Sequence, residues 1–341
     1  MALEVAWYDF VCFGIVGMAI VGALWVLGMN KEVSQRDYDS AYESLLLSRP
    51  NNEVVVNVLP TGHVSTSQLW TSCWRGLHPF YLLATRFLSF VIMLLFLVWD
   101  ILKYDASIFI YYTEWTFTLV TIYFALGTVV SAYGCWQFYN KSPARNRVKE
   151  EFLKKDVEET ISTNFIAYQE KETKGFIKLQ SRYVEEEFQQ RAGFWGYLMQ
   201  TTYQTCAGAA ILTDIVFWCV IVPFLTISHL RLSPLTGCMH TLNVAFLLLD
   251  TALNNLPFPW FRISYFVLWS CGYIIFQWVI HACGFKWWPY PFIVLNSKWA
   301  PIWYLCLAVI HIPCYGIYFL IVRAKNTILP GFFPQAFFRP Y

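Results

Sequence analysis

Apolar residues gather in seven long stretches along the chain, and polar segments separate them. The stretches lie at about Trp7–Met29, Pro79–Leu102, Ile108–Gln137, Tyr203–Ile227, Cys238–Leu256, Phe261–Ala282 and Trp299–Val322. Each is long enough for a helix to cross a hydrocarbon core that is ~30 Å thick. Backbone amides in lipid must be satisfied within their own segment, so the stretches should be helices. The pattern predicts an all-α membrane protein with about seven transmembrane helices.

The composition supports this class and excludes others. Hydrophobic residues make up 57% of the chain and charged residues only 13%, whereas a soluble domain has about 25% charged residues. The net charge of +2 comes without a basic stripe, so we expect no nucleic-acid partner. The chain has none of the common metal, phosphate or dinucleotide motifs, so we predict neither a cofactor nor a bound metal.

The basic residues predict the orientation of the chain in the membrane. With the N-terminus outside and seven crossings, the cytosolic segments carry 19 Lys and Arg residues and the exterior loops carry 4. Cytosolic loops are enriched in basic residues, so an outside N-terminus and a cytosolic C-terminus are favoured. The expected location is the plasma membrane or the endoplasmic reticulum.

The same pattern divides the chain into regions. We expect a first transmembrane helix at 1–30, a cytosolic linker at 31–77, a six-helix membrane core at 78–325 and a cytosolic tail at 326–341. The core contains a charged cytosolic insert at 141–191, where opposite charges recur at helical spacing. The insert is either a solvated surface helix or the contact site of a cytosolic protein partner, and membrane lipids are the other expected partners.

Ionisable residues inside the stretches are costly to place in lipid, so each marks a site or a buried pair. Arg86 lies about seven residues from the cytosolic end of the second stretch, and Asp250 about six residues from that of the fifth. These depths match at ~1.5 Å per residue, which predicts a structural ion pair. Asp214 in the fourth stretch is the alternative partner of Arg86.

A hydroxyl and an imidazole are expected at one depth near the exterior end. Thr113 in the third stretch and His240 in the fifth should both lie roughly 5–8 Å below the exterior boundary. Such a pair is the minimum for an activated nucleophile, because the histidine removes the proton while the oxygen attacks a carbonyl. Asn243, within one turn of His240, is a candidate to orient the base or to donate to an oxyanion. Thr116 is the alternative hydroxyl if the helix is rotated.

Several short motifs resemble those of the Rolling stone family, in the same order along the chain. They are His78-Pro79, Arg86, Asp100, the run from Tyr112 to Phe117, Met239-His240-Thr241, Asp250 and the run from Trp288 to Pro291. That family looks like a distant relative of the androgen-induced protein and the androgen-dependent TFPI-regulating protein. The resemblance covers about residues 74–325 without the charged insert.

The resemblance implies a function for two of the motifs. The androgen-induced relatives are similar to membrane threonine hydrolases that cleave fatty acyl esters, and their motifs resemble the segments around Thr113 and His240. Two positions depart from that pattern, because Thr236-Gly237 replaces an Asn-His pair and Glu114 replaces an apolar residue. The sequence therefore predicts a lipid-ester hydrolase, with a non-enzymatic membrane scaffold, adhesion or signalling factor as the alternative.

Overall fold

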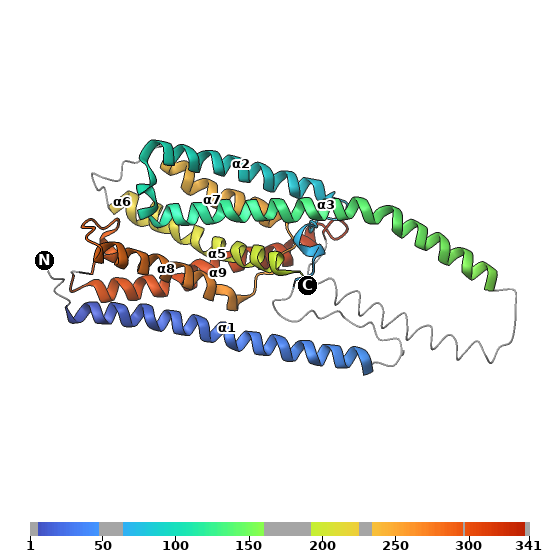
Figure 1. Ribbon diagram of the computed structural model, residues 1–341, viewed down its shortest axis with the longest axis horizontal. Coiled ribbons are helices and arrows are strands. Elements are labelled where there is room, and N and C mark those ends of the chain that lie inside the picture. The colour runs from blue at the N-terminus through green and yellow to red at the C-terminus, as the bar shows by residue number, and fades with distance from the viewer. Residues whose placement is uncertain (1–5, 48–63, 160–191, 225–233, 296, 338–341) are drawn as a thin grey trace.

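The computed structural model describes residues 6–47, 64–159, 192–224, 234–295 and 297–337, and these residues form an all-α bundle (Figure 1). The bounds of its long helices are α1 Trp7–Leu47, α2 Pro79–Tyr104, α3 Tyr112–Glu159, α5 Phe194–Ile215, α7 Pro234–Leu253, α8 Ile263–Ala282 and α9 Ala300–Phe332. A π-helical segment, Val216–Ile221, continues α5 and leads into the short α6, Val222–Phe224. The all-α class is confirmed.

Six helices in the described part of the chain are long and apolar enough to cross a membrane: α1, α2, α3, α5 with the π-helical segment, α8 and α9. The chain is therefore a multi-pass membrane protein. The fifth predicted stretch also forms a helix, α7, but His240, Asn243 and Asp250 lower its apolar character. Helix α7 packs within the bundle against α2, α3 and α5.

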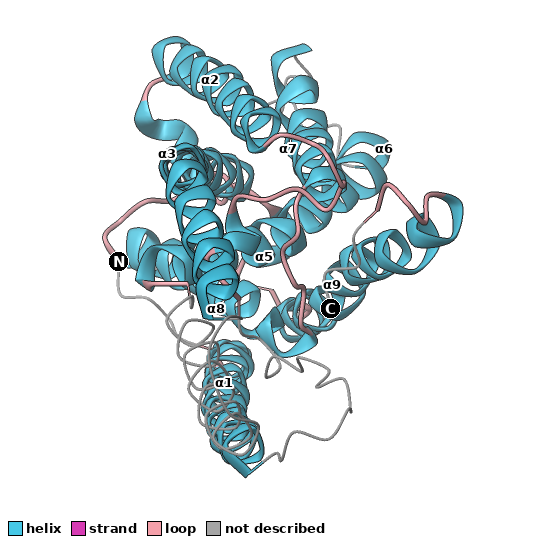
Figure 2. Ribbon diagram, turned by 90° about the vertical axis from the view of Figure 1, so that its right-hand side faces the viewer, coloured by secondary structure: helices cyan, strands magenta, loops and turns pink. Residues whose placement is uncertain are grey.

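The outer faces of the helices are apolar, as lipid contact requires. Trp7, Phe10, Met18, Val21 and Trp25 on α1 each expose more than 60% of their surface. Helix α1 lies at the edge of the bundle beside α8 and α9 (Figures 1 and 2). Single exposed apolar residues are normal in water, but continuous apolar faces of this size indicate contact with lipid.

Helix α5 lies at the centre and contacts α3, α7, α8 and α9 (Figure 2). Small residues in its middle, from Cys206 to Ala210, are all buried. A Cβ atom added at Gly208 would lie 2.5 Å from the Phe266 ring of α8, so glycine permits the close approach of these helices. Small residues serve this purpose at many membrane helix interfaces.

Two predicted regions continue in ways that the sequence pattern did not describe. The apolar part of α1 that could cross a membrane is Trp7–Val33, close to the predicted first span, but the helix continues to Leu47 and at about 60 Å is twice as long as a hydrocarbon core. Residues 64–78, predicted as linker, pack on the end of the bundle, where Leu69 and Cys73 are buried. The backbone N–H of Cys73 donates to Leu253 O at 3.1 Å, so α7 holds this segment in place.

The charged insert begins on a helix. Helix α3 continues to Glu159, well beyond the bundle (Figure 1). The remainder of the insert, residues 160–191, lies outside the described residues, so the prediction of a partner contact there stays a prediction.

Candidate functional site

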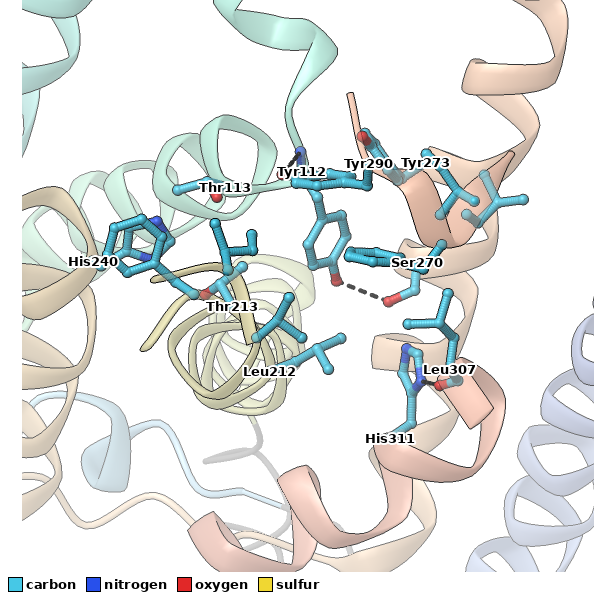
Figure 3. A pocket seen from close by; sticks show the side chains of 16 residues that line it. Tyr112, Thr113, Leu212, Thr213, His240, Ser270, Tyr273, Tyr290, Leu307 and His311 are labelled. Carbon is cyan, nitrogen blue, oxygen red and sulfur yellow. Dashed lines mark hydrogen bonds between the residues drawn. The ribbon is translucent and has the colours of Figure 1, made fainter. Parts of the chain in front are cut away.

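An inner chamber lies inside the bundle near the beginnings of α3 and α7 (Figure 3). Its volume is about 90 Å³, and most of its inner surface is apolar. Polar side chains enter it at two places. Thr113 and His240 lie on one side, and Ser270 and His311 lie on the other (Figure 3).

A larger outer chamber of about 290 Å³ lies next to the inner one. Its lining is more polar and includes two carboxyl groups, Asp100 and Glu114. The two chambers share five lining residues, which are Thr113, Phe217, Ile221, His240 and Tyr290. Thr113 and His240 therefore lie at the junction of a polar chamber and an apolar one.

Two residues from the end of the fourth span hold the imidazole of His240. Asp214 Oδ1 lies 3.5 Å from His240 Nδ1, within ion-pair distance but without hydrogen-bond geometry. The Phe217 ring stacks on the imidazole, with centroids 3.8 Å apart and planes 13° apart. Phe217 belongs to the π-helical segment, and single π-helical turns within α-helices occur frequently at functional sites.

Asp214 was predicted as the alternative partner of Arg86, and the structure instead places it beside His240. The predicted stretches place Asp214 nearer in depth to Arg86 than to His240, so counting residues along them could not reveal this contact. The sequence thus predicted an ion pair for Asp214 and gave no indication that it lies at this site.

Tyr290 closes the junction from the loop between α8 and α9. Its hydroxyl accepts a hydrogen bond from the backbone N–H of Tyr112 at 3.2 Å. Burial raises the pKa of Tyr290 well above its ordinary value, and hydrogen bonding with Thr113 lowers it only in part. The phenol therefore stays protonated at neutral pH and keeps its own proton for donation. Sequence reasoning used this tyrosine only as part of a motif.

The remaining sequence candidates lie apart from the junction. Asn243 is fully buried, neither of its side-chain polar atoms has a hydrogen-bond partner, and it lines neither chamber. Thr116 is also fully buried and lines neither chamber, so Thr113, and not Thr116, is the candidate threonine that the chambers reach.

The inner chamber continues towards α1. A third cavity, of about 80 Å³, lies among α1, α8 and α9 and shares Ser270, Ile274, Leu307 and His311 with the inner chamber. Val16 and Ala19 of α1 line its far side. The three cavities thus lie beside one another, with the more polar one at the α2–α3 connection and the most distant, apolar one against helix α1.

Arg86 and Asp250 form a separate, fully buried cluster at the other end of α2. Arg86 Nε donates to Asp250 Oδ1 at 2.8 Å, and Arg86 Nη1 donates to Leu69 O and Ser131 Oγ. Asp250 Oδ2 accepts hydrogen bonds from Tyr123 and Asn254. Since neither residue lines the chambers, the cluster joins α2, α3, α7 and the segment before α2 as a structural element.

The described residues contain no group of three or more His, Cys, Asp or Glu residues that could hold a metal ion. The fold and its internal cavities define a class: an all-α, multi-pass membrane protein with an internal, partly apolar site. Comparison of the chain with protein-family models, curated proteins and solved structures gives no match, so the Rolling stone resemblance stays a prediction.

Proposed function

We propose that this protein is a membrane hydrolase that cleaves carboxylic esters of long-chain lipids, with Thr113 as the nucleophile and His240 as the general base. The observation that carries the proposal is the position of these two residues where a polar and an apolar chamber meet. A long-chain ester is divided in the same way as the two chambers, because an apolar acyl chain lies on one side of its polar carbonyl group.

In the proposed reaction, His240 takes the proton of the Thr113 hydroxyl while Oγ attacks the ester carbonyl carbon. The tetrahedral intermediate collapses to an acyl-threonine, and the alcohol leaves with the proton from His240. A water molecule then gives a proton to His240 and attacks the acyl-threonine, which releases the fatty acid and restores the threonine hydroxyl.

Neighbouring groups support these roles. Asp214 beside Nδ1 favours the tautomer that carries its proton on Nδ1, which leaves Nε2 as the basic nitrogen. The ring of Phe217 fixes the plane of the imidazole. The Tyr290 hydroxyl accepts from the Tyr112 backbone, so its proton is available to the developing oxyanion.

The two apolar cavities can accommodate the acyl chain. The inner chamber and the cavity among α1, α8 and α9 would hold the chain, and α1 is the lipid-facing side from which it would enter. The order of the motifs shared with the Rolling stone family supports the same assignment for Thr113 and His240.

The proposal includes a topology. With α7 as a seventh crossing and the N-terminus outside, Thr113 and His240 lie near the exterior surface. The excess of basic residues in the predicted cytosolic segments supports this orientation. The start of α1 and the end of α9 lie at opposite ends of the bundle, as an odd number of crossings requires (Figure 1).

The test is ester hydrolysis by purified protein in lipid nanodiscs, with release of fatty acid from long-chain esters as the readout. Thr113→Ala and His240→Gln should each lower kcat by a factor of about 100 or more, since each removes a reacting group. Thr241→Ala is the matched control, because Thr241 is exposed and its hydroxyl donates to Gly237 O, away from the chambers. Folded wild-type protein that hydrolyses none of these esters would instead favour a scaffold, adhesion or signalling role.

A further inference from the structure

The outer chamber contains two buried carboxyl groups that the proposed hydrolysis does not use. Asp100 and Glu114 are 6% and 8% exposed, and both line this chamber. Glu114 Oε2 has no hydrogen-bond partner. A buried ionised carboxylate is costly unless a cation or several hydrogen-bond donors compensate it.

Neither carboxyl group has a direct cationic partner in the described part of the chain, where no Lys, Arg or His lies within ion-pair distance of it. Lys103 acts on Asp100 electrostatically, but it is exposed and its ammonium lies 4.8 Å from the centroid of the Tyr104 ring. A cationic ligand in the chamber would supply this missing compensation and would favour the ionised form of the two carboxyl groups.

Aromatic rings line the same chamber. Tyr104, Tyr111, Tyr290 and Phe217 all face it together with the two carboxyl groups. Rings around a carboxylate suit an ammonium group, because the faces of aromatic rings attract cations, and quaternary ammonium groups bind in such cages. A phosphate or sulfate would be repelled by the carboxylates.

We propose that the outer chamber binds the cationic end of a long-chain amphiphile, an amine or quaternary ammonium group without a phosphate. The proposal rests on the proposed function and names its substrate class: an ester whose carbonyl lies at Thr113 and His240, whose acyl chain fills the inner chamber and whose alcohol part carries the positive charge. Glu114 and Thr113 line the same chamber, so a positive charge beside Glu114 lies in the chamber that also contains the reacting carbonyl.

The experiment measures binding and requires no catalysis. Full-length protein in nanodiscs of neutral lipid is labelled with a photoactivatable long-chain trimethylammonium probe, and labelling is competed with three hydrolysis-resistant amphiphiles. These are hexadecyltrimethylammonium, the neutral hexadecyl glycerol ether and hexadecyl sulfate. We expect the first to compete at about one tenth of the concentration of the neutral ether, which corresponds to about 1.4 kcal/mol, and the sulfate to compete least.

Two variants test whether the carboxyl groups cause the preference for the cationic amphiphile. Glu114→Gln and Asp100→Asn should each reduce the preference for the cationic competitor to less than about threefold. Asp105→Asn is the matched control, since Asp105 is an exposed carboxylate near the same end of α2 that does not line the chamber. Size-exclusion chromatography checks that each variant is folded.

Two outcomes would overturn the proposal: equal competition by the cationic and neutral amphiphiles, or an unchanged preference in folded Glu114→Gln and Asp100→Asn proteins. The binding measurement uses hydrolysis-resistant amphiphiles and so requires no reaction at Thr113. A cationic preference without ester hydrolysis would therefore support this binding site and contradict the proposed hydrolase. Ester hydrolysis without the cationic preference would support the hydrolase and contradict this binding site.

Discussion

At the residue scale, counting residues along the predicted spans gave one of the two pairs that the structure shows. Arg86 and Asp250 have matching depths and lie 2.8 Å apart. Asp214 and His240 lie 3.5 Å apart, although the predicted stretches place Asp214 much deeper than His240, and counting residues does not give the rotation that brings them together. A helical residue is turned about 100° from its neighbour, so this step needs the packed bundle.

The Arg86 cluster provides a prediction about stability. Arg86→Ala leaves the buried carboxylate of Asp250 without its cation, and breaking such a pair costs about 3–5 kcal/mol. We expect a lower folded yield and a lower melting temperature in detergent. Arg323→Ala, which removes an exposed arginine from α9, is the control and should change little. A melting temperature of Arg86→Ala equal to that of wild type would contradict a structural role.

Cys73 provides a prediction about reactivity. Its side chain is completely buried, and burial raises the pKa of its thiol above the ordinary value, although Lys325 lowers it in part. The thiol therefore stays protonated at pH 8, and only the thiolate is reactive. We expect iodoacetamide to modify the exposed Cys283 and to leave Cys73 unmodified until the protein is denatured. Equal modification of both in folded protein would show that residues 64–78 do not pack as described.

At the element scale, the apolar stretches predicted where helices lie, but their ends depended on other forces. Helix α1 continues to Leu47 because the segment from residue 30 to residue 47 contains neither proline nor glycine, the two residues that disfavour a helix most. The segment at 64–78 looks like a linker in sequence because it is polar and short of apolar runs. It is ordered by Arg86, whose Nη1 donates to Leu69 O at 2.8 Å, a contact from a different element.

The contact between α5 and α8 is testable through two glycines. Gly208→Ala places a Cβ atom 2.5 Å from the Phe266 ring, and overpacking of this kind costs about 1–3 kcal/mol. Gly272→Ala on α8 meets no atom within 4 Å and should be neutral or stabilising, because alanine favours a helix by about 1 kcal/mol. Thermal unfolding of the two variants compares them directly. A stable Gly208→Ala protein would mean that α5 and α8 are further apart.

At the scale of the whole molecule, composition and periodicity were sufficient for the class. Long apolar stretches can exist in lipid only as helices, so the all-α multi-pass architecture followed directly from the sequence. The chambers could not be predicted from the sequence, because side chains from many elements form them together. These elements are α2, α3, α5, α7, α8, α9 and the loop after α8. Thr113 and His240 were predicted as a pair, whereas the contributions of Asp214, Phe217 and Tyr290 required the fold.

The orientation is tested by labelling cysteines in intact cells, in a background whose exposed native cysteines are replaced. Lys286→Cys, in the loop after α8, should react with a membrane-impermeant maleimide from outside. Phe332→Cys, at the exposed end of α9, should react only after permeabilisation. Labelling in the reverse order would move Thr113 and His240 to the cytosolic face.

Covalent labelling of the nucleophile tests directly whether Thr113 is an activated hydroxyl. A long-chain fluorophosphonate reacts with an activated hydroxyl, whose oxygen displaces fluoride and retains the phosphonyl group. Purified protein is treated in nanodiscs, digested and analysed by mass spectrometry to locate the adduct. We expect an adduct on Thr113 in the wild-type protein and in Thr241→Ala, and its loss in His240→Gln. Folded wild-type protein without an adduct, or with the adduct on another residue such as Ser270, would contradict it.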